Sequence, residues 1–217
     1  MPRRFVNERR RDPYYRAAQR EGLRSRAAFK LAHVDDHFHL LRRGARVLDL
    51  GAAPGGWSVV ASERVGPRGT VVAVDPRPIE PIPGTRVVRG RVGDPSLPER
   101  LGGAAFDVVL SDMSPRISGA YGTDHARSAS LVRDAFHLAC DVLRPNGAFV
   151  AKVFDGDMVP ELQRELSVAF ASVHRTKPPA SREPSSELYL VGLGFRGGTH
   201  RSGGPERRGS PPPGPAI

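Results

Sequence analysis

Lysine is rare in this sequence, and its few positions are candidates for chemistry. Of 33 positively charged side chains, 30 are arginines and three are lysines, namely Lys30, Lys152 and Lys177. Arginine cannot lose its proton in a protein, whereas a lysine that is buried or crowded by charge can. Lys152 ends the apolar run GAFVA, where a surface charge is not expected. We therefore expect Lys152 to take part in chemistry that needs a neutral amine.

The strongest local signal is the segment LDLGAAPGGWS at residues 48–58, in which an apolar strand ends, glycines turn the chain and a helix begins. Glycine lets the backbone turn sharply and leaves room for a ligand, and open α/β sheets bind ligands beyond the carboxyl ends of their strands. The dinucleotide pattern G-x-G-x-x-G is absent, because Ala53 stands where its second glycine belongs. The segment therefore predicts a nucleoside ligand without a pyrophosphate.

Acidic residues close four successive strand-like segments, at Asp49, Asp75, Asp94 and Asp112. Aspartate often ends a strand for structural reasons alone, but four in succession beside this loop favour one acidic ligand-binding edge. Asp75 is placed to accept hydrogen bonds from a ribose, and Asp94 to reach an adenine amine. S-adenosylmethionine fits such an edge, because its sulfonium and amino groups are cationic, its ribose donates hydrogen bonds and it carries no phosphate.

The elements that must position these residues alternate between strands and helices. Helical spacing is expected at 14–41, 57–65, 124–143 and 160–171, and apolar strands at 46–50, 69–75, 85–90, 106–112, 148–154 and 187–195. This alternation predicts an α/β fold with a doubly wound sheet in one domain, residues 14–196. We expect residues 1–13 to be a disordered basic arm and residues 197–217 a disordered tail rich in Gly, Pro and Arg.

The overall charge favours a nucleic-acid partner. The 217 residues carry a net charge of +10, and such a surface attracts polyanions. A single cysteine excludes an internal disulfide, and no apolar run reaches the ~20 residues that cross a bilayer, so we expect a cytoplasmic protein. Three histidines, His33, His37 and His39, lie close together in the sequence, but no further His or Cys completes a zinc site with them. We therefore expect no metal. Arginines expected to follow an RNA backbone are Arg3, Arg4, Arg9, Arg10, Arg11, Arg24 and Arg26.

Five ordered segments resemble the FtsJ/RrmJ (RlmE) family of RNA ribose 2'-O-methyltransferases. They are GLRSRAAFKL (22–31), DLGAAPGGWS (49–58), VLSDMSP (109–115), FVAKVF (149–154) and KPPASREPSSELYLVGLGF (177–195). The resemblance implies a Rossmann-like fold that uses S-adenosyl-L-methionine, with a seven-stranded, mostly parallel sheet and helices on both faces. It also implies a catalytic tetrad of Lys30, Asp112, Lys152 and Glu187, and cofactor contacts from Gly55, Trp57, Asp75, Asp94 and Asp112.

Within this tetrad we assign Lys152 as the acceptor of the proton that a ribose 2'-hydroxyl loses when it is methylated. Protonated lysine is a poor base, but a second lysine nearby and partial burial favour the neutral amine. Asp112 and Glu187 oppose this effect, so we expect them to orient the amines and balance charge. Lys30 and Glu187 then position Lys152, and Asp112 bridges the cofactor and the tetrad.

The resemblance further implies that the substrate is a uridine ribose in 23S rRNA, within the large ribosomal subunit. We expect the protein to act as a monomer. Lys177 and Arg182 are expected to contact RNA phosphates. Two alternatives stay open: methylation of a ribose in a tRNA anticodon loop, and a non-catalytic RNA-binding factor in ribosome assembly that retains the fold. An NAD-linked oxidoreductase is disfavoured by the loop GAAPGG.

Overall fold

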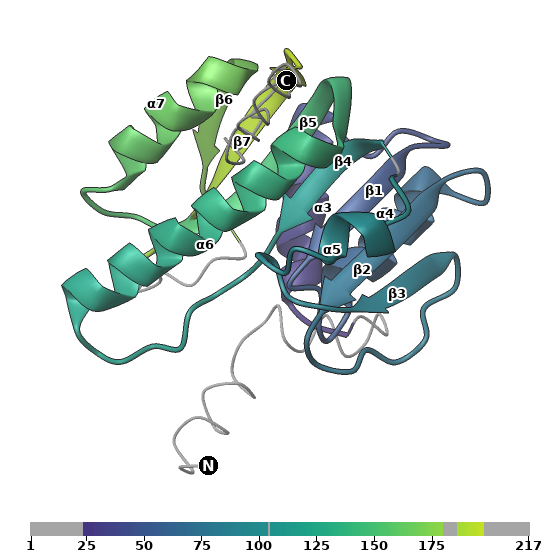
Figure 1. Cartoon of the computed structure of the whole chain (residues 1–217), viewed down its shortest axis with the longest axis horizontal. Helices are drawn as coiled ribbons and strands as arrows, with labels where there is room; N and C mark the ends of the chain where they lie inside the picture. Colours follow the sequence, from purple (N-terminus) through teal and green to yellow (C-terminus); the bar gives the residue numbers. More distant parts are fainter. Residues whose placement is uncertain (1–23, 104, 180–185, 198–217) are drawn as a thin grey trace, which may run out of the picture.

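The computed structural model describes residues 24–103, 105–179 and 186–197, whose strands form one sheet of seven (Figure 1). The strand order is β3-β2-β1-β4-β5-β7-β6, and only β7 runs antiparallel to its neighbours. The predicted fold class is thereby confirmed. The strands are β1 Arg46–Leu50, β2 Thr70–Asp75, β3 Thr85–Arg89, β4 Phe106–Ser111, β5 Leu143–Phe154, β6 Phe170–Thr176 and β7 Glu187–Phe195.

The central strands are apolar on both faces because helices cover both sides of the sheet. Every residue of β4 is buried, as are the last four residues of β1. Parallel strands that are covered on both faces have such continuous apolar runs, and these runs allowed the strands to be predicted from the sequence. All successive pairs from β3 to β5 are parallel, so their carboxyl ends meet along one edge of the sheet.

Among the described residues, two helices pack on one face of the sheet and three on the other. One core cluster joins the first face to α3 (Ala27–Phe38) and α4 (Gly56–Val65). The second cluster joins the opposite face to α5 (Leu97–Arg100), α6 (Tyr121–Val142) and α7 (Val159–Ala169). This three-layer arrangement is visible in Figure 1, with α6 crossing in front of the sheet.

Two sequence expectations differ from the structure. The helix expected at 160–171 ends at Ala169, and β6 follows at once as a strand not identified from the sequence. β6 lies at the edge of the sheet and only its first residue is buried, so it lacks the apolar run that marks the central strands. β5 begins at Leu143 rather than at residue 148, and its pairing with β4 shifts register between Phe106 and Val108. Pro145-Asn146-Gly147 therefore lies inside the strand and does not precede it.

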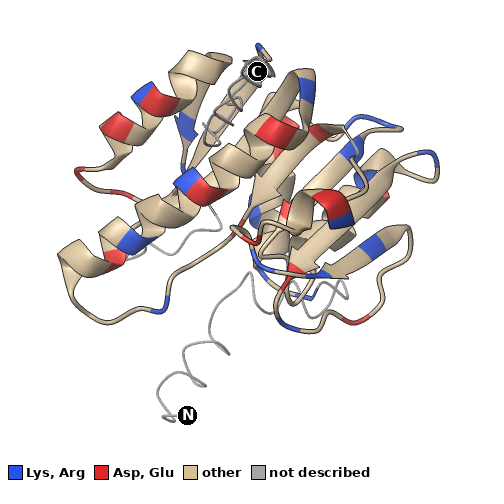
Figure 2. Ribbon diagram, in the orientation of Figure 1, with Lys and Arg blue, Asp and Glu red and all other residues tan. Residues whose placement is uncertain are grey.

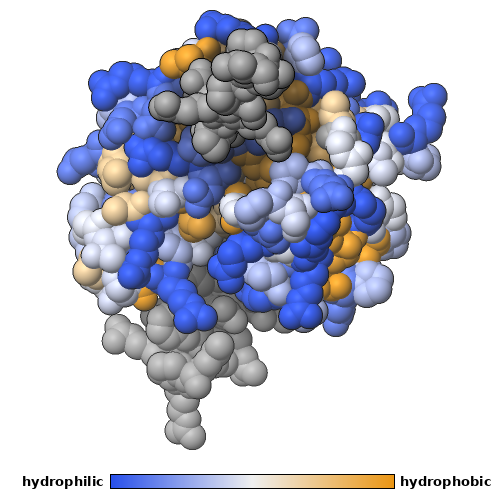
Figure 3. Space-filling view, in the orientation of Figure 1, coloured by the Kyte–Doolittle hydropathy of each residue, from blue (hydrophilic) through white to orange (hydrophobic). Residues whose placement is uncertain are grey.

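One face of the molecule is seen in the space-filling view (Figure 3), and it is largely polar. Hydrophilic residues cover most of the face seen in Figure 3, and Figure 2 shows acidic and basic residues side by side along α6 and α7. Among the described residues, no helix combines the length and apolar character that a membrane span requires. The expected arm, the tail beyond Gly197, the helical segment 14–23 and Arg182 lie outside the described residues.

Candidate active site

A cavity of about 1270 Å³ opens at the carboxyl edge of the parallel strands. It is larger than the roughly 300–1,000 Å³ typical of a small-molecule pocket, so it has room for a nucleoside ligand and part of a second substrate. The loop after β1, the ends of β2 and β4, and parts of α3 and α6 contribute to its wall. Six of the predicted site residues line it: Lys30, Trp57, Asp75, Asp112, Lys152 and Glu187.

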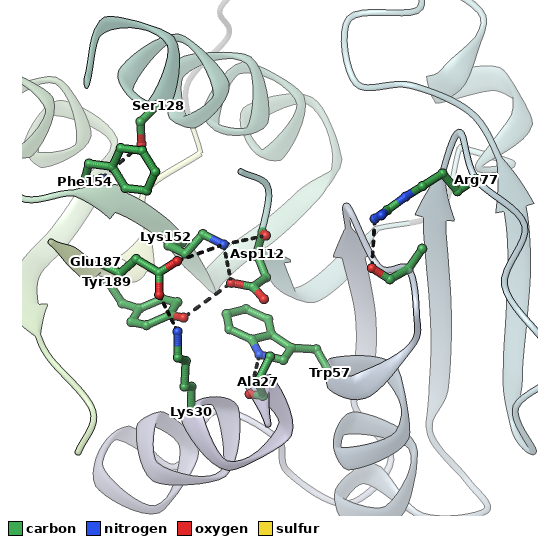
Figure 4. Close-up of polar contacts among 11 residues, drawn as sticks. Ala27, Lys30, Trp57, Arg77, Asp112, Ser128, Lys152, Phe154, Glu187 and Tyr189 are labelled. Carbon is green, nitrogen blue, oxygen red and sulfur yellow. Dashed lines mark hydrogen bonds and ion pairs between the residues drawn. The ribbon is translucent and has the colours of Figure 1, made fainter. Parts of the chain in front are cut away.

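The four tetrad residues meet in one cluster of alternating charge (Figure 4). Lys30 Nζ lies 2.5 Å from Glu187 Oε2, and Lys152 Nζ lies 3.8 Å from Glu187 Oε1. Lys152 Nζ is also 3.0 Å from both Asp112 Oδ1 and the Asp112 carbonyl oxygen. Both lysine side chains are buried, whereas each carboxylate is about one-fifth exposed. Glu187 thus bridges the two amines.

The antiparallel pairing of β5 with β7 builds this cluster. Lys152 lies opposite Tyr189, and Phe154 lies opposite Glu187. Alternate residues of a strand face the same side, so Glu187 and Tyr189 share a face with Lys152. Lys30 enters from the first face on α3, and Asp112 directly follows β4. Residues separated by up to 157 positions in the sequence therefore meet at one point.

Tyr189 is a central member of the site that was not predicted. Its hydroxyl donates a hydrogen bond to Asp112 Oδ1 at 3.3 Å, and Lys30 Nζ lies 5.9 Å from its ring centroid. The ring also packs against Trp57, with centroids 5.6 Å apart. Burial and the neighbouring Asp112 and Glu187 carboxylates raise the pKa of Tyr189 well above its usual value. Tyr189 therefore stays a neutral donor that holds the Asp112 carboxylate toward Lys152.

The glycine loop is shaped by close contacts. Gly51 has a φ of 72°, and a Cβ there would lie 2.5 Å from Met113 Cγ. Gly55 has a φ of 106°, and a Cβ there would lie 2.7 Å from Ile82 Cδ1. A side chain is strained at both positions. Trp57 is the second residue of α4, beside this loop, and its Nε1 donates a hydrogen bond to the Ala27 carbonyl oxygen at 2.8 Å. The indole thus ties the loop to α3, the helix that carries Lys30.

Asp49 is fully buried at the base of the cavity. Its Oδ2 accepts a hydrogen bond from Ser58 Oγ at 2.6 Å, while within the described part of the chain its Oδ1 has no hydrogen-bond partner. Burial raises the pKa of the Asp49 carboxyl to about 7, helped by the Asp112 and Asp75 charges and opposed by Ser58. An acidic group of this kind favours a ligand that brings a cation or a hydrogen-bond donor.

Asp75 lies in the cavity wall as predicted, but it already has protein partners. Its oxygens accept hydrogen bonds from the Ala53 amide at 3.0 Å and from the Arg77 amide at 2.8 Å. The Arg77 guanidinium also bonds both oxygens of Asp75 and the Ala53 carbonyl oxygen. Burial acts to raise the pKa of Asp75, but these hydrogen bonds outweigh it and hold the pKa below its usual value. Asp75 therefore stays charged at the cofactor side of the cavity.

Two predicted cofactor residues lie outside the cavity wall formed by the described residues, namely Gly55 and Asp94. Asp94 Oδ1 accepts hydrogen bonds from Ser96, and its Oδ2 lies 3.5 Å from Arg100 Nη1. Of the four aspartates expected to form one acidic edge, the structure thus brings three to the cavity. In the segment between β3 and α5, Val92 lines the cavity and Asp94 does not.

Arg24 serves the fold of the loop, although an RNA contact was expected of it. Its guanidinium donates hydrogen bonds to the carbonyl oxygens of Glu80 at 2.8 Å and Pro81 at 2.6 Å, and to that of Pro54 at 3.4 Å. These bonds join the glycine loop to the segment that follows β2. Other arginines line the cavity, namely Arg77, Arg91, Arg116 and Arg127, together with Arg26 from the expected set. The described residues contain no group of His, Cys, Asp or Glu side chains arranged to hold a metal.

The fold and this site define a class of protein that the family comparison identifies. Residues 23–195 match the model of the FtsJ-like methyltransferases. The chain belongs to the FtsJ-like methyltransferase family, and the predicted family and enzyme class are confirmed.

Relatives and solved structures agree with this assignment. A protein of Granulibacter bethesdensis named ribosomal RNA large subunit methyltransferase E is 47% identical over 196 residues, which cover 89% of this chain and 84% of the relative. A protein of Haloarcula marismortui with the same name is 45% identical over 212 residues, covering 92% and 78%. The structure of a ribosomal RNA methyltransferase from Plasmodium falciparum is similar with a TM-score of 0.73 and 29% identity, covering 80% of this chain and 99% of that one.

The cofactor of this methyltransferase is S-adenosyl-L-methionine, and the cavity fits it. The buried Asp49 oxygen offers an acceptor to a cationic or hydroxyl-bearing ligand, and Asp75 and Asp112 add negative charge along the same wall. The tight glycine loop brings backbone close to the ligand without side chains. The charge of this inner wall is therefore complementary to a sulfonium cofactor.

Proposed function

We propose that this enzyme methylates the ribose 2'-hydroxyl of a uridine in the 23S rRNA of the large ribosomal subunit. The observation that carries the proposal is the joining of the Lys30, Asp112, Lys152 and Glu187 cluster to the glycine loop in one cavity. The names of the curated relatives support the ribosomal substrate. A ribosomal substrate also agrees with the expected cytoplasmic location, and the basic charge of the chain agrees with an RNA partner.

The inner part of the cavity holds the cofactor in this proposal. Asp75 accepts hydrogen bonds from its ribose, Asp49 and Asp112 face its cationic end, and Trp57 fixes the loop beside it. When bound, S-adenosyl-L-methionine supplies a methyl group on a positively charged sulfur. Gly55 and Asp94 do not line the cavity, so their contribution is indirect. Gly55 allows the shape of the glycine loop, and Asp94 stabilises the turn after β3 by accepting a hydrogen bond from the Ser96 amide.

Lys152 accepts the proton of the 2'-hydroxyl through its Nζ. The cluster contains two amines and two carboxylates, so it is neutral when both lysines are charged. When Lys152 is neutral, the cluster carries one net negative charge, and this charge favours uptake of the substrate proton. The Asp112 carbonyl and carboxylate oxygens fix the position of Nζ, while Lys30 holds Glu187 in place.

The cluster therefore does two jobs at the ribose. It orients the amine toward the hydroxyl, and it provides a site where the released proton is stabilised by Asp112 and Glu187. Alignment of two bound reactants can supply much of the rate enhancement in a transfer of this kind. General base catalysis adds roughly 100- to 10,000-fold.

The test of the proposal is methyl transfer in vitro, followed by mapping of the product. The purified protein is incubated with S-adenosyl-L-methionine carrying a labelled methyl group and with large ribosomal subunits, or tRNA, from cells that lack the enzyme. We expect label at one uridine 2'-oxygen of 23S rRNA and none in tRNA. Label in tRNA alone would favour the anticodon-loop alternative, and cofactor binding without transfer to either RNA would favour the assembly factor.

A further inference from the structure

An exposed aromatic stack lies beside the proposed catalytic cluster. Tyr121, the first residue of α6, is 63% exposed, although it is a large and partly apolar side chain. Its ring lies 3.8 Å from the His125 ring, at an interplanar angle of 32°. One side of the Tyr121 ring thus rests on His125, and the exposure of the residue leaves other ring surface open to solvent. We call these two rings the Tyr121–His125 stack.

The stack is fixed by the surrounding backbone. The two ring nitrogens of His125 lie 2.8 Å from the Tyr121 carbonyl oxygen and 3.1 Å from that of Asp155. A Cβ added to Gly156 would lie 2.7 Å from His125 Cδ2 and 3.0 Å from the Tyr121 hydroxyl oxygen, so the backbone packs directly against the stack. The preceding loop is also tied down, because Asp124 accepts hydrogen bonds from Ser118 and the Gly119 amide. Tyr121 is therefore held in place before any partner binds.

Phe154 connects the stack to the cluster. Its ring lies 5.7 Å from the His125 ring, and its residue pairs with Glu187 across the β5–β7 ladder. Phe154 is two residues beyond Lys152, which is about 7 Å along a strand. Figure 4 shows Phe154 between the cluster and Ser128 of α6, to which its amide donates a hydrogen bond at 3.0 Å. Phe154 thus links the stack, through one ring contact, to the strand that carries Lys152.

The chemistry around the stack suits RNA. Arg116 precedes it in the loop and Arg127 follows it on α6, and both are exposed and line the cavity. Proteins that bind single-stranded RNA combine positive charge along the backbone with aromatic rings on which bases stack. Tyr121 differs in this from Phe136, the inward-facing aromatic residue of the same helix, which is buried.

We propose that the Tyr121–His125 stack holds a nucleobase of the RNA substrate, a few nucleotides from the ribose that is methylated. This inference rests on the proposed function, because it needs an RNA strand whose 2'-hydroxyl reaches Lys152. The stacked base fixes the strand, and Arg116 and Arg127 attract its phosphates. The stack is a positioning element for the substrate and takes no part in the proton transfer.

Steady-state kinetics with large ribosomal subunits that lack the methyl group test this inference. We expect Tyr121→Ala to raise the KM for subunits about tenfold, because loss of one base–aromatic stack has an effect of this order. Tyr121→Phe, which retains the ring, should restore the KM of the unmodified enzyme. Val168→Ala changes another exposed apolar residue, on α7, and serves as the control. Affinity for S-adenosyl-L-methionine, measured by calorimetry, should not change in Tyr121→Ala.

An unchanged KM in Tyr121→Ala would overturn the inference, and so would an equal loss of cofactor affinity, which indicates damage to the fold. Failure of the unmodified enzyme to methylate large subunits would instead contradict the proposed function, so the two failures are distinguishable. A photocrosslinking analogue of phenylalanine introduced in place of Tyr121 identifies the occupant. Crosslinks to 23S rRNA next to the methylated uridine would support the inference, and crosslinks to a ribosomal protein alone would overturn it.

Discussion

The two ends of the cavity are built in different ways. The cofactor end comes from a nearly continuous stretch, in which the glycine loop, Asp49 and Trp57 lie within a single strand, turn and helix. The cluster end takes Lys30, Asp112, Lys152 and Glu187 from four elements that are distant in the sequence. The first depends on backbone shape and on the buried carboxyl groups of Asp49 and Asp75. The second depends on side chains whose charges balance one another.

Because the two ends are built differently, different kinds of substitution should impair them. A change of backbone freedom should damage the cofactor end and leave the chemistry of the cluster intact. A change of amine at the cluster should stop proton transfer and leave cofactor binding intact. Four substitutions, from the largest expected effect to the smallest, separate the two ends.

Lys152→Arg should have the largest effect on the cluster end. It keeps the positive charge but replaces an amine that can be neutral by a guanidinium that cannot. We expect the single-turnover rate of methyl transfer to fall roughly 100- to 10,000-fold, with unchanged affinity for S-adenosyl-L-methionine. Lys177→Arg is the matched control, because it makes the same change at an exposed lysine outside the cluster. A normal rate in Lys152→Arg would remove Lys152 from the mechanism.

Asp49→Asn probes the buried carboxyl of the cofactor end. Since the pKa of Asp49 rises from 3.8 to about 7 in the folded protein, the folded state retains a proton that the unfolded chain releases. The contribution of Asp49 to stability is therefore greatest below pH 4 and is lost as the pH rises to about 7. Asparagine cannot ionise, so it avoids this loss. The difference in unfolding free energy, variant minus unmodified protein, should therefore be larger at pH 8 than at pH 5, by on the order of 2 kcal/mol.

Urea unfolding at the two pH values measures this gain, with Asp141→Asn on the exposed side of α6 as the control. The same variant should bind the cationic cofactor more weakly at pH 8. A gain that is equal at both pH values would show that Asp49 does not titrate as a buried group.

Gly55→Ala tests the backbone of the loop. The new Cβ meets Ile82 Cδ1 at 2.7 Å at a φ of 106°, so the loop must shift. We expect about tenfold weaker cofactor binding by calorimetry, corresponding to about 1.4 kcal/mol. Gly93→Ala is the control, since Gly93 also has a positive φ but no atom lies within 4 Å of the added Cβ. Equal losses in both variants would assign the effect to general backbone strain and not to the loop.

Arg77→Ala should have the smallest effect. Arg77 is 67% exposed, and its guanidinium bonds the Asp75 oxygens that a cofactor ribose would use. Exposed ion pairs contribute about 0–1 kcal/mol, so their removal should tighten cofactor binding by no more than about fivefold. Arg89→Ala removes the same charge at the neighbouring strand end as a control. Weaker binding in Arg77→Ala would mean that Arg77 itself contacts the cofactor.

The sequence allowed the sheet to be predicted where burial is complete. β1 and β4 are apolar on both faces, so their residue patterns were sufficient. β6 was missed because a partly exposed edge strand has no such pattern, and the start of β5 was missed because Pro145-Asn146-Gly147 has the composition of a turn. A local residue pattern therefore predicts a strand reliably only when the strand is buried along its whole length.

The site was predictable to different degrees at its two ends. The glycine loop could be inferred from residue types alone, because strand, turn and ligand site are contiguous. The cluster needed the family resemblance, because nothing local indicates that Lys30 meets Glu187. Tyr189 was missed although it stands two residues after Glu187, a spacing that puts both on one face of a strand. The partners of Asp75 and Asp94 could not be foreseen, because they depend on side-chain positions in loops.

The most direct test of the account is a crystal structure of the enzyme with S-adenosylhomocysteine and an RNA that contains the target uridine. The measured quantity is the distance from the uridine 2'-oxygen to Lys152 Nζ. The account predicts about 2.6–3.2 Å, the hydrogen-bonding range required of a general base. A 2'-oxygen that lies beyond the reach of Lys152 and contacts only Lys30 or Glu187 would contradict it.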